Sequence, residues 1–118
     1  MYAYVRCCSI LEKKKLNLDK NLDKNELLKN YDLLSKIINF PIYLEKFTSE
    51  RSPHSLVHFT KELAANYHSF YEQNPVITNN QEESNARLLI TKATSIVLKN
   101  SFRIIGGYPF GENVRWLG

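Results

Sequence analysis

The fold of this chain is decided by one long amphipathic stretch, SPHSLVHFTKELAANYHSFYEQNP, at residues 52–75. Ser52 is a good helix N-cap, and Pro53 suits the first helical position, where its missing N–H is not needed. Apolar residues then recur at helical spacing until Asn74-Pro75, which is a helix-ending signal. The predicted core stripe is Leu56, Phe59, Leu63, Tyr67 and Phe70. The stretch therefore predicts a long helix with one buried face.

Helical spacing also recurs upstream of this stretch. A first helix is predicted over residues 1–15, with an apolar stripe of Ala3, Cys7, Ile10 and Leu11. Asn25 is expected to cap a second helix. Its broad apolar face carries Leu27, Leu28, Tyr31, Leu34, Ile37 and Ile38. Pro41 is expected to close that helix and to begin the next, which contains Tyr43, Leu44 and Phe47.

The last predicted helix begins with Glu82 and Glu83, where acidic side chains favour a helix N-terminus, and ends at Gly106-Gly107. One face of it carries Ala86, Leu89, Ile90, Ala93, Val97 and Ile104. Of these, Leu89 and Ala93 are expected in the core together with Phe59, Leu63 and Phe70. The fold class predicted from these patterns is all-α, a small bundle of about five helices.

One domain is expected over residues 1–118, because domains usually span about 100–150 residues. Within it, residues 16–25 are a polar connector, residues 26–105 the helical core and residues 106–118 a tail. Leu-Asp-Lys-Asn occurs twice in succession at 18–25, and the segment 13–25 is expected to be the most mobile internal part of the chain.

Composition narrows the classes of function. The chain carries a net charge of +4, which permits a phosphate-bearing partner without requiring one. Neither a membrane span nor a signal peptide is found, and a catalytic ligase or kinase domain normally needs more chain. The adjacent cysteines, Cys7 and Cys8, are expected to be reduced, which predicts a cytoplasmic protein.

No catalytic, metal or cofactor site is predicted within this chain. His54 and His58 have the i, i+4 spacing of a zinc protease helix, but Ser55 stands where that motif requires Glu. No His is marked as a partner for a cysteine nucleophile. The glycine pair at 106–107 follows a helix, whereas a phosphate-cradling loop precedes one.

Two features bear on binding. Lys92, Lys99 and Arg103 recur along one side of the last helix and form a basic stripe, which suits phosphates but is also typical of an ordinary solvated face. Aromatic residues are dense at 67–71, where His68 and Tyr71 lie at the edge of the core stripe and suit stacking on unpaired bases. Core packing is the alternative for the aromatic residues, and it is expected for Phe70 and Tyr67.

Several motifs, in the same order, resemble a known family. The opening Tyr2-Ala3-Tyr4-Val5-Arg6 with Ser9-Ile10-Leu11 is similar to its "YAHAR…SIL" start, with Tyr4 where His is common. Residues 50–56, 62–64 and 68–71 resemble its central helix, and Asn85-Ala86-Arg87-Leu88 with the residues up to Asn100 resembles its last helix. The family is the DALR anticodon-binding domain of arginyl-tRNA synthetases.

The resemblance implies a tRNA-binding role, with the tRNA(Arg) anticodon stem-loop and a catalytic domain as partners. Candidate residues on the anticodon side are Tyr4, Arg6, Tyr67, His68, Tyr71 and Asn74. Candidate phosphate contacts are Arg87, Lys92, Lys99 and Arg103. Joining arginine to tRNA with ATP and Mg would belong to the catalytic domain, whose HIGH-like and KMSK-like signatures do not occur here. The chain alone is therefore expected to be inactive, monomeric, and either a C-terminal piece of a synthetase or a free-standing relative.

The tail departs from the family, whose chains commonly end soon after a Leu-Gly, whereas here Gly106-Gly107-Tyr108-Pro109-Phe110 runs on to Gly118. Two rivals to RNA binding stay open, namely a helical protein-interaction module and a purely structural domain. Affinity for RNA that falls steeply with salt would favour an RNA-binding domain over both of these rivals.

Overall fold

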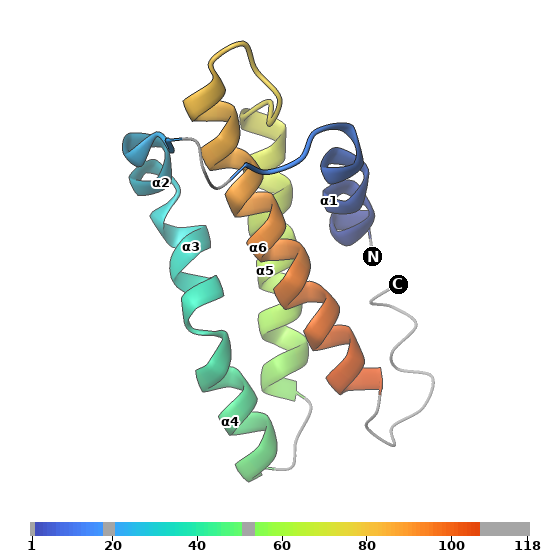
Figure 1. Cartoon of the computed structure of the whole chain (residues 1–118). Coiled ribbons are helices and arrows are strands. Elements are labelled where there is room, and N and C mark those ends of the chain that lie inside the picture. The colour runs from blue at the N-terminus through green and yellow to red at the C-terminus, as the bar shows by residue number, and fades with distance from the viewer. Residues whose placement is uncertain (1, 18–20, 51–53, 107–118) are drawn as a thin grey trace.

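The computed structural model describes residues 2–17, 21–50 and 54–106. These residues form helices and no strands, so the all-α prediction is confirmed. The helices are α1 (Tyr2–Lys13), α2 (Lys24–Lys29), α3 (Tyr31–Ile38), α4 (Phe40–Glu50), α5 (His54–Gln73) and α6 (Gln81–Gly106). In Figure 1, α2, α3 and α4 follow one another along one side of the bundle, α5 and α6 run beside each other, and α1 lies on the other side. No helix in the described ranges is long and apolar enough to cross a membrane.

Helix α5 follows the sequence prediction closely. Its five predicted core residues are all buried. It ends at Gln73, and the N–H of Asn74 still donates to the carbonyl of Phe70 at 3.0 Å. The predicted capping pair Ser52-Pro53 lies outside the described residues. The long helix is thus the element on which the other helices pack.

The single helix expected after residue 25 is two helices. Asp23, not Asn25, caps α2, because its carboxylate accepts from the backbone N–H groups of Asn25 and Glu26. Asn30 then interrupts the helical path between α2 and α3. Pro41 lies in the first turn of α4, as the sequence predicted.

This break changes which residues face the core. Leu33 is 4% exposed, whereas Leu28, Tyr31 and Ile38 are 70%, 65% and 73% exposed. The single broad apolar face predicted for this stretch is therefore not one buried face, because a restart at residue 31 gives α3 a different helical phase from α2.

Helix α6 is central and contacts α1, α2, α3 and α5. Its buried face includes Leu88, Leu98, Thr91 and Thr94, while the expected core residues Leu89 and Ala93 are only half-buried. The two threonine hydroxyls donate to carbonyls one turn back in the same helix, at 2.9 Å and 2.8 Å. Threonine can be buried here because its hydroxyl is hydrogen-bonded within the helix. A prediction from apolar residues alone therefore gives the wrong buried face for α6.

The connector is attached to α6 on both sides of residues 18–20, which lie outside the described residues. The backbone N–H of Asn17 donates to Asn85 Oδ1 at 3.2 Å, and Asn85 Nδ2 donates to the carbonyl of Asn17 at 2.8 Å. The N–H of Asp23 donates to the carbonyl of Glu82 at 3.2 Å. These bonds fix where the connector leaves α1 and where it enters α2. Its expected mobility stays a prediction.

Candidate nucleic-acid interface

Four side chains from α1 and α5 form a tyrosine–arginine cluster, which consists of Tyr2, Arg6, His68 and Tyr71. Tyr2 and Arg6 are one helical turn apart on α1, so their side chains lie on the same face. The Arg6 guanidinium carbon lies 4.9 Å from the centre of the Tyr2 ring and 4.7 Å from that of the Tyr71 ring. The His68 ring meets Tyr2 edge-on, with 6.4 Å between ring centres. A cation between aromatic rings holds this surface together.

The cluster leaves groups available to a ligand. Tyr2 is 60% exposed and His68 is also exposed. Arg6 donates from Nη2 to the Tyr2 hydroxyl, whereas its buried Nε has no hydrogen-bond partner within the part of the chain that the structure describes. Exposed rings and an arginine plane are groups on which unstacked bases stack.

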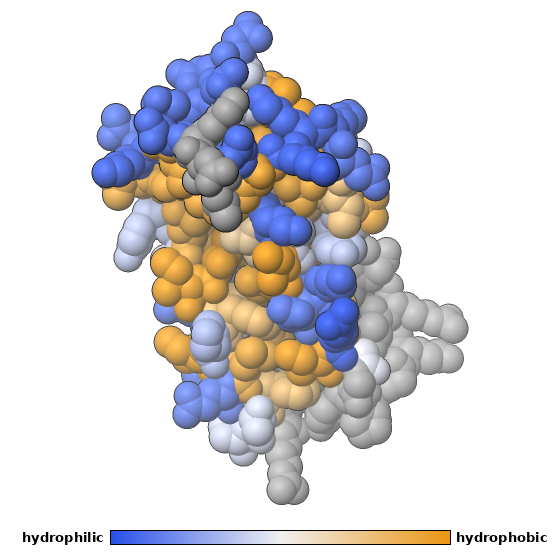
Figure 2. Space-filling view, in the orientation of Figure 1, coloured by the Kyte–Doolittle hydropathy of each residue, from blue (hydrophilic) through white to orange (hydrophobic). Residues whose placement is uncertain are grey.

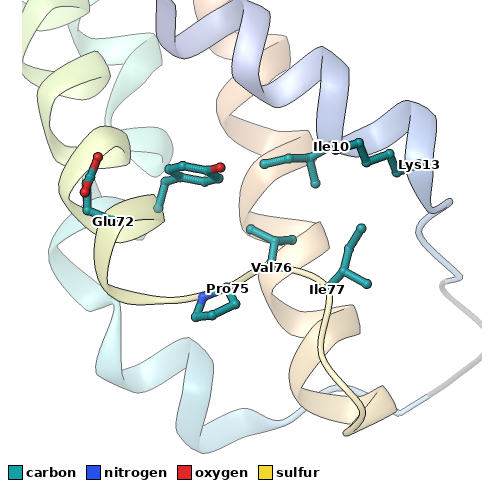
Figure 3. Close-up of a pocket in the computed structure, with 7 residues that line it drawn as sticks. Ile10, Lys13, Glu72, Pro75, Val76 and Ile77 are labelled. Carbon is teal, nitrogen blue, oxygen red and sulfur yellow. The ribbon is translucent and has the colours of Figure 1, made fainter.

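A cleft of about 400 Å³ continues from the cluster, between the end of α1 and the loop that joins α5 to α6. Tyr71 and Glu72 line it on the α5 side, and Ile10 and Lys13 line it on the α1 side. Figure 3 shows Ile10 facing Val76 and Ile77 across this space. The cleft beside this aromatic surface combines apolar side chains with one cationic and one anionic side chain, Lys13 and Glu72, which suits a base with polar edges.

Side chains of α6 hydrogen-bond to the loop that lines the cleft. Arg87 Nη1 donates to the carbonyl of Pro75 at 2.7 Å, and the Ser84 hydroxyl donates to the carbonyl of Val76 at 2.8 Å. Arg87 is buried, and its Nε also donates to Glu26 Oε1 on α2 at 2.7 Å. The position of the cleft wall therefore depends on α2 and α6, neither of which lines it.

Three of the candidate residues are buried and make hydrogen bonds within the domain. Tyr67 is fully buried and its hydroxyl is 2.9 Å from Thr91 Oγ1. Asn74 is buried and donates from Nδ2 to the carbonyl of Phe70 at 2.9 Å. Arg87 is buried in its ion pair with Glu26. The assignment of Tyr67 and Asn74 to the anticodon side and of Arg87 to the phosphate contacts stays a prediction, and each of the three side chains already makes a hydrogen bond within the domain.

The remaining cationic candidates are exposed on α6. Lys92, Lys99 and Arg103 all have exposed side chains. Tyr4 packs edge-on against Phe102, with 5.8 Å between ring centres. A hydrogen bond with Cys8 and burial raise the pKa of the Tyr4 phenol, and the charge of Arg103 opposes that shift. Tyr4 and Arg103 thus belong to the α1–α6 contact, whereas Arg6, His68 and Tyr71 belong to the cluster.

The sequence-based site predictions did not include Tyr2 or the cleft residues other than Tyr71. Tyr2 was detectable, because its i, i+4 spacing from Arg6 is that of a helical side-chain pair. Ile77 and Lys13 carry no comparable sequence signal, since they line the same cleft only because the α5–α6 loop packs beside α1. Within the described residues, no group of three or more His, Cys, Asp and Glu side chains is placed to hold a metal ion.

A comparison with known families gives the class of protein to which this fold belongs. Residues 1–111 match the family model of the DALR anticodon binding domain, and the chain belongs to that family.

The chain is similar to one part of each of several longer proteins. The chain is 40% identical over 111 residues to arginine–tRNA ligase 1 of Halalkalibacterium halodurans, and 39% identical over 111 residues to the arginine–tRNA ligase of Bacillus subtilis. The corresponding protein of Geotalea uraniireducens is 31% identical over 115 residues. In each case the match covers 89% of this chain and 20% of the relative, so the chain spans about a fifth of their length. No solved structure gives a significant match.

Proposed function

We propose that this chain binds the anticodon stem-loop of tRNA(Arg) and positions the tRNA for arginylation by the catalytic part of an arginine–tRNA ligase. Support comes first from the family match over residues 1–111, which carries the proposal. Arginine is inferred as the amino acid because the relatives are named arginine–tRNA ligases. ATP and Mg act in the catalytic part, and this chain contributes recognition alone, in the cytoplasm and as a monomer.

The geometry of the cluster fits this role physically. Anticodon bases in a loop can be splayed out, and their faces then stack on tyrosine, histidine or arginine planes. Tyr2, His68 and Tyr71 supply such faces around the Arg6 guanidinium. Lys13, at the adjoining cleft, and the exposed cations of α6 hold phosphates, which fix the position of the RNA without reading its sequence.

A filter-binding titration tests the proposal. The chain is titrated with an arginine-tRNA transcript and with the same transcript carrying a swapped anticodon. Wild type should prefer the first, and its affinity should fall steeply with salt. Tyr71→Ala should lose about 1–3 kcal/mol of binding free energy and discriminate less between the two RNAs.

A control is available in Ile42, an exposed side chain on α4, which contributes no residue to the cleft. Ile42→Ala should bind both RNAs as wild type does. Circular dichroism verifies that each variant is folded. Equal, salt-insensitive affinity of the wild-type chain for both transcripts would refute anticodon recognition. A folded Tyr71→Ala variant that binds normally would remove the cluster from the reading surface.

A second candidate function, docking to a protein, is favoured by apolar side chains on the other side of the bundle. Ile38 and Ile42 are exposed on α3 and α4. Figure 2 shows apolar surface over this side and over the middle of α6. Binding of no RNA at low salt would favour this candidate over the first.

A further inference from the structure

A second pocket lies on the opposite side of α5 from the tyrosine–arginine cluster. It encloses about 230 Å³ between the end of α5 and the turn that joins α2 to α3. Pockets for drug-sized ligands usually run to about 300–1,000 Å³, so this one suits a single planar group rather than a whole cofactor. Leu33 and Phe70, both buried, contribute apolar surface to it.

Carboxamide side chains dominate the polar lining. Asn30 and Asn74 are each oriented by a bond from Nδ2 to a backbone carbonyl, of Glu26 at 2.8 Å and of Phe70 at 2.9 Å. Their Oδ1 atoms are therefore left as fixed acceptors. Asn66 and Gln73 also line the pocket, and neither side chain takes part in a hydrogen bond with another described residue.

These groups select a ligand by its hydrogen-bonding edge. Lys29 and Asp32 at the pocket carry opposite charges, so the pocket has no net charge with which to attract a bare phosphate. Two fixed acceptors favour a ligand that presents N–H donors, and an exocyclic amino group offers two of them. The free amides of Asn66 and Gln73 can each accept and donate, which is the pattern that pairs with adenine N6 and N7.

We propose that this amide pocket binds an unpaired adenine base of the RNA. The adenine amino group donates to the fixed Oδ1 atoms of Asn30 or Asn74, and its ring nitrogens accept from Asn66 or Gln73. The base lies over Phe70 and Leu33. Because the occupant is part of an RNA, this assignment rests on the proposed RNA binding, but it concerns a second contact on a different face of α5.

Nucleotide titration isolates this pocket from the cluster. Isotope-labelled chain is titrated with AMP and, separately, with UMP, while the side-chain amide resonances of Asn66 and Gln73 are followed by NMR. AMP should shift them in a saturable way and UMP should not, since uracil has no exocyclic amino group. The variant Asn66→Ala/Gln73→Ala should weaken AMP binding at least about fivefold. Both residues lack described partners, so the variant should fold.

Asn79→Ala is the matched control, because Asn79 is an exposed amide in the α5–α6 loop. It should bind AMP as wild type does. Shifts confined to Tyr71, His68 and Ile77, or identical responses to AMP and UMP, would overturn the adenine pocket while leaving the proposed function intact. Loss of tRNA binding by Tyr71→Ala with AMP shifts retained at Asn66 and Gln73 would support two separate sites.

Discussion

Replacing Arg87 by methionine should destabilise the domain more than any surface change. Arg87 donates from Nε to Glu26 at 2.7 Å and from Nη1 to the Pro75 carbonyl at 2.7 Å, and its Nη1 lies 3.4 Å from Glu83 Oε1. Both partners of the Arg87–Glu26 pair are nearly fully buried. Methionine restores the apolar volume of the stem but leaves the Glu26 carboxylate buried and unpaired. Removing one partner of a buried ion pair costs about 3–5 kcal/mol, a large part of the roughly 5–15 kcal/mol available to a domain.

Urea unfolding followed by circular dichroism measures this cost. The double variant Arg87→Met/Glu26→Leu should be more stable than Arg87→Met alone, because no buried charge is then left without a partner. Arg87→Met should also weaken tRNA binding. Arg87 does not line the cleft, but its loss removes the hydrogen bond to the Pro75 carbonyl, which holds the loop that does. Two results would show that the ion pair does not hold α2, α6 and the loop together. One is a loss of unfolding free energy below about 1 kcal/mol for Arg87→Met, and the other is strict additivity of the effects of Arg87→Met and Glu26→Leu in the double variant.

Three further predictions concern the core, pH and salt. Phe70→Ala should cost about 3–5 kcal/mol in urea unfolding, and a cost below about 1 kcal/mol would contradict the burial of Phe70. Burial raises the pKa of the Cys7 thiol from 9.0 to about 12 and also raises that of the Tyr67 phenol. The native state keeps these protons where the unfolded chain releases them, so the free energy of unfolding should be undiminished below about pH 9 and fall as the pH rises towards 12, with a shallower fall in Cys7→Ala. Lys99→Ala should weaken the cognate and the swapped transcript alike and reduce the salt slope by about one, and a change in the preference between the two would place Lys99 at a base instead.

The parts of the fold that were predictable from sequence are those with strong local signals. Helix α5 has a regular apolar stripe and a clear end at Asn74-Pro75, and both appear in the structure. The break at Asn30 has no comparable signal, because asparagine is only modestly unfavourable within a helix.

The candidate site was predictable only where its residues share a helix face. Tyr71 and His68 follow from their places beside the α5 stripe. Burial of Arg87 does not, since arginine is usually exposed and its partner Glu26 lies 61 residues away in the sequence. The cleft is likewise a product of tertiary packing, because its two sides come from α1 and from the α5–α6 loop.

The contact of α1 with α6 has a consequence for how the chain assembles. These helices are the first and the last in the described sequence, yet they pack against each other. Closing so long a loop is entropically slow, whereas α3, α4 and α5 meet through nearby segments. During synthesis α1 must wait until α6 has left the ribosome before it finds its main partner. The tyrosine–arginine cluster, which needs α1 in place, should therefore be among the last surfaces to form.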